Sequence, residues 1–155
     1  MAASARQVAE LMGERLGATD FSGFADLFAE DGVFEYPFEN PSWPPVLRGR
    51  EEIRAHLVES RRGIRSLIEL TGFDTVVHET TDPAVLVLEH EVSGRTIATG
   101  EAFRFASGVG IVTVRDGQIA RYRDYTNPLG AAKVTGRLAE LAAGLAARAG
   151  AVTGS

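Results

Sequence analysis

The order of its secondary-structure signals constrains the fold of this chain more than any other feature. Residues 1–62 carry mainly helical patterns, whereas the region from Ile64 to Tyr125 is rich in β-branched and aromatic residues. The turn signals TTDP, SG, ASG and RDG divide that region into short strands. Helices followed by a run of strands predict an α+β fold, with the helices packed on one face of an antiparallel or mixed sheet.

The helical half is predicted to hold three helices, over residues 3–17, 19–32 and 50–62. The second is expected to begin at Asp20 and end at Gly32, with Phe24 and Phe28 on its buried face. A short strand over 33–37 and a proline-rich loop precede the third helix. The expected strands are LIEL, TVVH, AVLVLEHEV, TIATGEAFRF, GIVTV and IARYRDY.

Length and composition narrow the class of protein. A chain of 155 residues fits one domain, expected over 1–130, with residues 131–155 as a peripheral helical tail. It has no cysteine, which excludes disulfides and thiolate nucleophiles. A net charge of −5 without a basic track disfavours nucleic acid as a partner. The first ten residues hold no secretory pattern, and no apolar run is long enough for a membrane span, so we expect a cytoplasmic protein.

Four segments together resemble one known family. The stretch VRDGQIARYRDYTNPLG is similar to the last hairpin of SnoaL-like proteins, in the nuclear-transport-factor-2-like superfamily, and DLFAEDGVFEYPF, LRGREEIRAHL and VLEHEVSGRTIATG agree with it upstream. The resemblance implies a cone-shaped curved sheet whose central pocket is closed by N-terminal helices. It also implies a homodimer, which we expect to form through the outer sheet face. Such folds host ketosteroid isomerases, limonene-epoxide-hydrolase-like enzymes, polyketide cyclases, phenazine-biosynthesis condensing proteins and non-catalytic binders.

Two carboxylates are candidate catalytic groups. On the strand IARYRDY, Asp124 shares a face with Tyr122, which we place inside the cone, where burial disfavours the ionised carboxylate. In the resemblance, Asp124 holds the position of the catalytic acid of the epoxide-hydrolase-like and phenazine-type relatives; the alternative is an Asp that caps the following turn. Glu101 resembles the ketosteroid isomerase acid that hydrogen-bonds the substrate oxygen. Its alternative is a solvated Glu at a strand start.

His56 and Ser60 lie four residues apart and share one face of the third helix. Their spacing resembles the His/Ser pair that assists the acidic residue in phenazine-type condensing proteins, and His56 is a candidate proton shuttle. His90 shares a strand face with Leu88, and a buried, satisfied histidine is the preferred interpretation. A β-bulge would instead turn Glu89 or Glu91 inward.

Aromatic residues are the remaining candidates for substrate binding. Tyr36 and Tyr122 can orient a substrate through their hydroxyl groups, Trp43 can cover the pocket mouth, and Phe103 shares the face of Glu101. Tyr36 replaces the proton-shuttling carboxylate of ketosteroid isomerase, and Met12 its first-helix tyrosine, which argues against steroid-type enol chemistry with the standard residues.

No HxH, HExxH or phosphate-cradling motif occurs, so neither a metal site nor an organic cofactor is expected. The sequence therefore predicts a cofactor-independent acid–base enzyme acting on a small hydrophobic molecule, a cyclase or isomerase first and an epoxide hydrolase second. The alternative is a binding module without chemistry.

Overall fold

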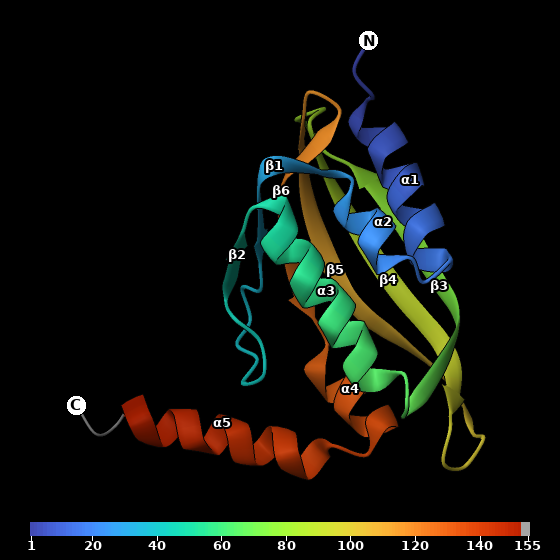
Figure 1. Cartoon of the computed structure of the whole chain (residues 1–155), viewed down its shortest axis with the longest axis vertical. Helices are drawn as coiled ribbons and strands as arrows, with labels where there is room; N and C mark the ends of the chain where they lie inside the picture. Colours follow the sequence, from blue (N-terminus) through green and yellow to red (C-terminus); the bar gives the residue numbers. More distant parts are fainter. Residues whose placement is uncertain (153–155) are drawn as a thin grey trace.

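The computed structural model describes residues 1–152, and a single curved sheet of six strands organises it (Figure 1). The helices are α1 (Ala5–Gly17), α2 (Phe21–Ala25), α3 (Arg50–Ile64), α4 (Pro128–Thr135) and α5 (Leu138–Val152). The strands are β1 (Phe28–Glu35), β2 (Val46–Arg48), β3 (Ile68–Glu79), β4 (Val85–Thr96), β5 (Ala102–Arg115) and β6 (Gln118–Thr126). Their order in the sheet is β2-β1-β6-β5-β4-β3, and within it β1 pairs with β6 in parallel while the other neighbours are antiparallel. The sheet stays open, and the predicted α+β fold with a mixed sheet is confirmed.

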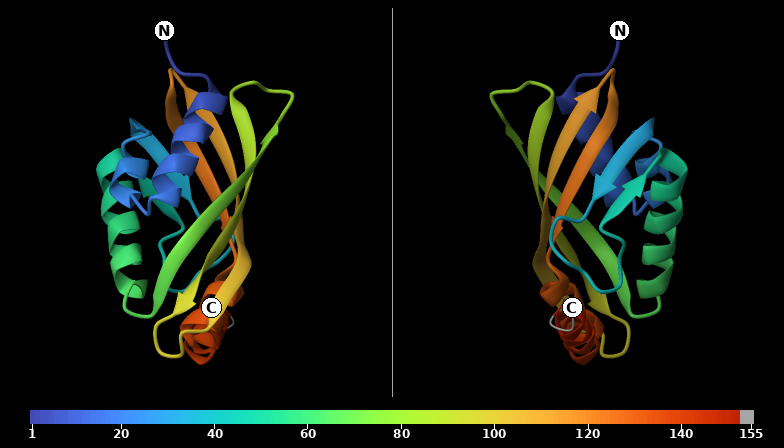
Figure 2. Two further views of the ribbon diagram at one scale, coloured as in Figure 1. Left: turned by 90° about the vertical axis from the view of Figure 1, so that its right-hand side faces the viewer. Right: turned by 90° about the vertical axis from the view of Figure 1, so that its left-hand side faces the viewer.

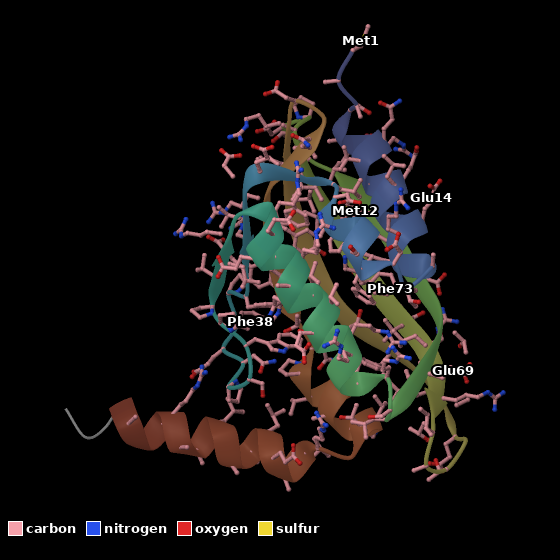
Figure 3. All side chains as sticks on the ribbon, viewed as in Figure 1. Met1, Met12, Glu14, Phe38, Glu69 and Phe73 are labelled. Atoms are coloured by element: carbon pink, nitrogen blue, oxygen red, sulfur yellow. The ribbon has the colours of Figure 1, made fainter. Side chains whose placement is uncertain are left out.

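Helices α1 and α3 cover the concave face of the sheet (Figure 2). Helix α1 starts with a capping box, in which the Ser4 hydroxyl accepts from the Gln7 backbone N–H and the Gln7 side chain accepts from the Ser4 N–H. Its buried face is formed by Val8, Met12 and Leu16, as the helical spacing predicts. Figure 3 shows Met12 on the side of α1 that faces the sheet.

The second predicted helix is wrong beyond its first turn and a half. Helix α2 ends at Ala25, and β1 begins at Phe28, so Phe28 lies on a strand beside Ile119 of β6. The register with β6 shifts between Phe28 and Val33. Gly32 lies within this irregular segment. A larger residue would not fit there, because its Cβ would come within 2.9 Å of the Ala29 carbonyl oxygen. Pairing with β6 has overridden the helical spacing of the phenylalanines.

The strand predictions were correct in kind but wrong at two turns. The expected turns SG and ASG lie inside strands β4 and β5, whereas the turn between these strands is formed by residues 97–101. The segments LIEL and TVVH, expected as two strands, contribute to one strand, β3. At ASG, β5 carries a β-bulge: Ala106 pairs with Glu91 and Gly108 with His90, which leaves Ser107 as the extra residue. The bulge lies on β5, so β4 keeps its alternation, with His90 on the inner face and Glu89 on the outer one.

A hydrophobic core fills the space between the helices and the sheet near the N-terminal end of the molecule. Its largest fully buried side chains are Phe28, Phe34, Met12, Ile53, Leu88, Ile119, Val8 and Val112. Helices α4 and α5 follow β6 and lie at the other end of the sheet (Figure 1). None of the helices within residues 1–152 is long and apolar enough to span a membrane.

Candidate functional site

A cavity of about 660 Å³ opens between the concave sheet face, α3, the loop between β1 and β2, and helices α4 and α5. Its walls are mainly aromatic and aliphatic, with contributions from Leu16, Phe21, Phe24, Phe34, Trp43, Leu57, Ile64, Ile68, Leu70, Phe73, Val92, Phe105 and Leu141. Polar residues also line it, among them Ser60, His90, Tyr122 and Asp124, and the charged Arg137 and Glu140 lie at the side formed by α4 and α5. This composition suits a ligand that is largely apolar and has few polar atoms.

Asp124 lies in this cavity, as the alternation along β6 predicts. In the part of the chain that the structure describes, no hydrogen bond or ion pair engages its carboxyl group. Burial among apolar groups raises the pKa of the Asp124 carboxyl from 3.8 to about 7, because the cavity solvates the carboxylate poorly. Asp124 therefore exists in both protonation states near neutral pH.

Two glycines on β5 make room beside this part of β6. Gly110 is the register partner of Asp124, and a Cβ on Gly110 would overlap the Tyr122 hydroxyl group. A Cβ on Gly108 would come within 3.4 Å of Asp124 Oδ1. The two glycines therefore leave the space on β5 that the Tyr122 hydroxyl and the Asp124 carboxyl occupy.

Tyr122, His90 and Thr75 form a hydrogen-bonded chain across three elements. His90 Nε2 lies 2.8 Å from Tyr122 Oη, and His90 Nδ1 lies 2.9 Å from Thr75 Oγ1. The ring of Phe73 packs against His90 with 5.1 Å between centroids. Burial lowers the pKa of His90 to about 4, so the imidazole is neutral at pH 7. His90 is a buried and satisfied histidine, and it also lines the cavity.

His56 belongs to a second cluster, beside the cavity. Its Nε2 lies 2.8 Å from Tyr36 Oη and 3.5 Å from Ser60 Oγ, and the Trp43 ring meets His56 edge to face at 5.9 Å. Burial lowers the pKa of His56. Trp43 and Ser60 line the cavity, while Tyr36 and His56 pack behind Trp43.

Among the described residues, neither His56 nor Tyr36 hydrogen-bonds the Asp124 carboxyl group, and Tyr36 is affected only by its charge. Burial raises the pKa of the Tyr36 phenol, and the negative charge of Asp124 raises it further. The Tyr36 hydroxyl group is thus protonated, bonded to His56 and within electrostatic reach of Asp124.

Glu101 and Phe103 lie outside the cavity that holds Asp124. Glu101 is exposed in the turn between β4 and β5, where its carboxylate accepts a hydrogen bond from the Thr99 hydroxyl at 3.1 Å. Phe103 lines a separate hollow of about 700 Å³ between this turn and the end of α4. The structure therefore does not bring either residue to Asp124, and the solvated alternative describes Glu101. The turn at 97–101 interrupts the expected strand TIATGEAFRF and leaves Glu101 exposed.

Sequence reasoning missed several residues of the cavity. Phe73 lines the cavity from the inner face of β3 (Figure 3 labels Phe73), and the alternation of TVVH extended toward its N-terminus would have placed it there. Thr75, on the same face, contacts His90 and does not line the cavity. The expected peripheral tail supplies further cavity-lining residues: Ala131, Ala132, Val134 and Thr135 of α4, Arg137, and Glu140, Leu141 and Gly144 of α5. No local pattern indicates that this tail folds back over the cavity.

Over the described residues 1–152, no group of three or more His, Asp or Glu side chains is placed to hold a metal ion.

Comparisons with known proteins agree with this architecture. Residues 8–122 match the family described as SnoaL-like domain. A PhzA/B-like protein of Pseudomonas aeruginosa is 35% identical over 111 residues, which cover 71% of this chain and 74% of that protein. A solved structure from Bacillus subtilis, provisionally named an isomerase, superposes with a TM-score of 0.72 at 26% identity and covers 86% of this chain and 93% of its own. A protein of Catenulispora acidiphila with a ketosteroid isomerase-like fold gives a TM-score of 0.65 at 16% identity, covering 86% and 95% of the two chains. The predicted cone-shaped fold is thereby confirmed.

Proposed function

Because this chain belongs to the SnoaL-like domain family, we propose that it is a cofactor-independent isomerase or cyclase that uses acid–base catalysis on a hydrophobic small molecule. At the level of the family, the comparisons support a small-molecule isomerase or cyclase. The acid–base step is our inference from the cavity.

The observation that carries this proposal is the unpaired carboxyl group of Asp124 in an apolar cavity. A general base works best when its pKa lies near the working pH, and burial raises the pKa of Asp124 to about 7. In the proposed step, the Asp124 carboxylate takes a proton from a carbon beside a carbonyl group, and the electron pair moves onto the carbonyl oxygen. Return of the proton to another carbon completes an isomerisation. Alternatively, the enolate carbon attacks a second carbonyl group and closes a ring, and the resulting alkoxide takes the proton back from Asp124.

His56 is proposed as the proton partner of Asp124. It acts through the Tyr36 hydroxyl group, which lies 2.8 Å from His56 Nε2. A neutral imidazole can both give and take a proton, and burial keeps His56 neutral by lowering its pKa.

Epoxide hydrolysis is a weaker candidate. That chemistry, as the resemblance implies it, pairs the acidic residue with an arginine. The arginines of β6, Arg121 and Arg123, alternate with Asp124 and lie on the outer face, where Arg121 binds Glu35. No Lys or Arg side chain of residues 1–152 forms an ion pair with Asp124.

The test is exchange of α-hydrogens for deuterium in a panel of hydrophobic cyclic ketones that includes 1-tetralone, followed by ¹H NMR in D₂O. We expect the protein to accelerate exchange, and Asp124→Asn to lower the rate by roughly 10²-fold or more, since positioned proton transfer contributes about 10²–10⁴-fold. Asp74→Asn is the matched control, because Asp74 is an exposed strand residue on the outer face.

The outcomes separate the enzyme from the binding module. Binding of ketones without accelerated exchange, or equal exchange by wild type and Asp124→Asn, contradicts the proposal and favours a protein that binds without chemistry.

A further inference from the structure

The chain of Thr75, His90 and Tyr122 ends in the cavity at a hydroxyl group, and the direction of its hydrogen bonds decides what that hydroxyl group can do. The neutral imidazole of His90 carries one N–H and one unprotonated nitrogen, so it donates at one end and accepts at the other. The chain therefore has two possible directions.

In one direction, the Thr75 hydroxyl donates to Nδ1 of His90, and Nε2–H donates to Tyr122 Oη. The Tyr122 proton then remains free and lies in the cavity. In the other direction, Tyr122 donates to Nε2 and Nδ1–H donates to Thr75, which leaves the proton of the half-buried Thr75 hydroxyl without an acceptor. Among the described residues, the Thr75 hydroxyl has His90 as its single hydrogen-bond partner. The first direction is thus the one that leaves its unused donor where a ligand can accept from it.

We propose that Tyr122 donates a hydrogen bond to an oxygen atom of the ligand, and that His90 and Thr75 are positioning residues that fix this donor direction. This inference rests on the proposed function and specifies its substrate class. The ligand is an uncharged, largely apolar molecule with a carbonyl oxygen.

The placement of Tyr122 relative to Asp124 sets where that oxygen lies. The two residues lie two positions apart on the inner face of β6, so their Cα atoms are separated by about 6.5–7 Å along the strand. A carbonyl oxygen that accepts from Tyr122 leaves the adjacent carbon and its hydrogen facing Asp124. When Asp124 removes that hydrogen, the charge develops on the oxygen that Tyr122 already contacts. Donation from Nε2–H of His90 makes the Tyr122 hydroxyl a stronger donor to this charge.

The structure around Tyr122 is built to keep its hydroxyl group in place. The Tyr122 side chain is 3% exposed, its ring stacks on Phe34 at 4.9 Å, and Gly110 leaves the space that the hydroxyl oxygen occupies. Burial and the charge of Asp124 hold the pKa of the phenol well above its ordinary value, so the proton stays on Tyr122. Tyr122 therefore serves as a donor and does not ionise.

The first experiment needs no ligand. Long-range ¹H–¹⁵N NMR on protein with ¹⁵N-labelled histidine reports which imidazole nitrogen carries the proton. We expect the Nε2–H form for His90 at pH 7. In Thr75→Val, which removes the donor to Nδ1 with little change in shape, that preference is lost, whereas Thr75→Ser keeps it. An Nδ1–H form in the wild type overturns the proposal, because the Tyr122 hydroxyl would then donate its hydrogen bond to Nε2 of His90 and not to a ligand.

The second experiment uses 1-tetralone and tetralin, which share a ring system and differ by the carbonyl oxygen. Tyr122→Phe is expected to weaken 1-tetralone binding roughly 2- to 10-fold, the range for one hydrogen bond, and to leave tetralin binding unchanged. Tyr125→Phe is the matched control, since Tyr125 lies on the outer face against Phe38. Equal loss of both ligands, or loss of neither, contradicts the role of Tyr122.

The two proposals fail separately. An Nδ1–H form of His90 removes the role of Tyr122 even where Asp124→Asn abolishes exchange. Retained exchange in Asp124→Asn removes the proposed function, while the His90 tautomer and the Tyr122→Phe binding result still decide the role of Tyr122.

Discussion

The environment of Asp124 has a consequence for stability as well as for chemistry. The ordinary pKa of this carboxyl group is 3.8, and in the folded protein burial raises the pKa to about 7. Between these two values the folded state binds the proton more tightly than the unfolded state. The free energy of unfolding therefore falls as the pH rises from about 4 to 7. Above pH 7, ionisation of Asp124 no longer changes it.

The first prediction follows from this dependence. Asp124→Asn replaces the carboxyl group with an amide that does not ionise. The difference in the free energy of unfolding between Asp124→Asn and the wild type should therefore shift in favour of the variant by about 1–3 kcal/mol from pH 5 to pH 8. Urea unfolding at the two pH values measures this shift. Asp74→Asn should keep a constant difference from the wild type. A constant difference for Asp124→Asn as well would contradict the buried position of the carboxyl group.

Single residues of the site were predictable where a strand alternates without interruption. Tyr122 and Asp124 were placed correctly because β6 keeps its alternation over residues 121–126. His90 was placed correctly because the bulge lies on β5. Glu101 and Phe103 do not join this cavity, because a turn at 97–101 interrupts the expected strand TIATGEAFRF, and the single local signal for that turn is Gly100, which takes a positive φ of 70°.

At the scale of elements, the type of each long segment was predictable and its limits were not. The first and third helices were expected over 3–17 and 50–62 and occur as α1 (Ala5–Gly17) and α3 (Arg50–Ile64). Phe28 shows why the second helix was overextended, because helical spacing of apolar residues also fits a strand that is buried on one face. Its pairing with Ile119 is a contact between distant parts of the chain, which no local pattern contains.

The position of α5 is the largest departure from local expectation. Arg148 of α5 donates to Glu39 at 3.2 Å and to the Pro41 carbonyl oxygen at 3.0 Å. Gly144 lies so close to Pro41 that a Cβ would come within 2.9 Å of it. These contacts hold α5 against the loop that carries Trp43, at one wall of the cavity.

The second prediction concerns this contact. Arg148→Glu and Glu39→Arg should each loosen α5 from the loop and raise quenching of Trp43 fluorescence by acrylamide, because Trp43 is partly buried there and is the sole tryptophan of the chain. The double variant restores opposite charges and should return quenching to the wild-type level. An exposed ion pair contributes about 0–1 kcal/mol, so the opening equilibrium should shift by no more than about 5-fold. Unchanged quenching in both single variants would show that α5 does not cover Trp43.

At the scale of the whole molecule, the outer sheet face is the surface left without a covering layer (Figure 2). It carries Val76, Val87, Val109, Ile111 and Tyr125 on neighbouring strands, with Phe38 against Tyr125. Val76 and Phe38 are 56% and 60% exposed. Contiguous apolar residues on a sheet face are typical of a surface that binds another protein.

The third prediction is a homodimer through this face. Light scattering at micromolar concentration should give twice the mass of the chain. Ile111→Glu, at the centre of the face, should give the monomer, because a carboxylate would lose its hydration in the interface and its cross-strand neighbour Arg123 would offset only part of that cost. Leu11→Glu on the exposed side of α1 is the control and should remain dimeric. A monomeric wild type would refute the dimer.

The proposed function depends most on the protonation of Asp124, and ¹³C NMR measures that protonation directly. A pH titration of the side-chain carboxyl carbon of Asp124, assigned by its loss in Asp124→Asn, should have its midpoint near pH 7, as the apolar cavity requires. A midpoint near 4 for Asp124 would show that the carboxyl group is solvated, and it would contradict the proposed role as a base tuned to neutral pH.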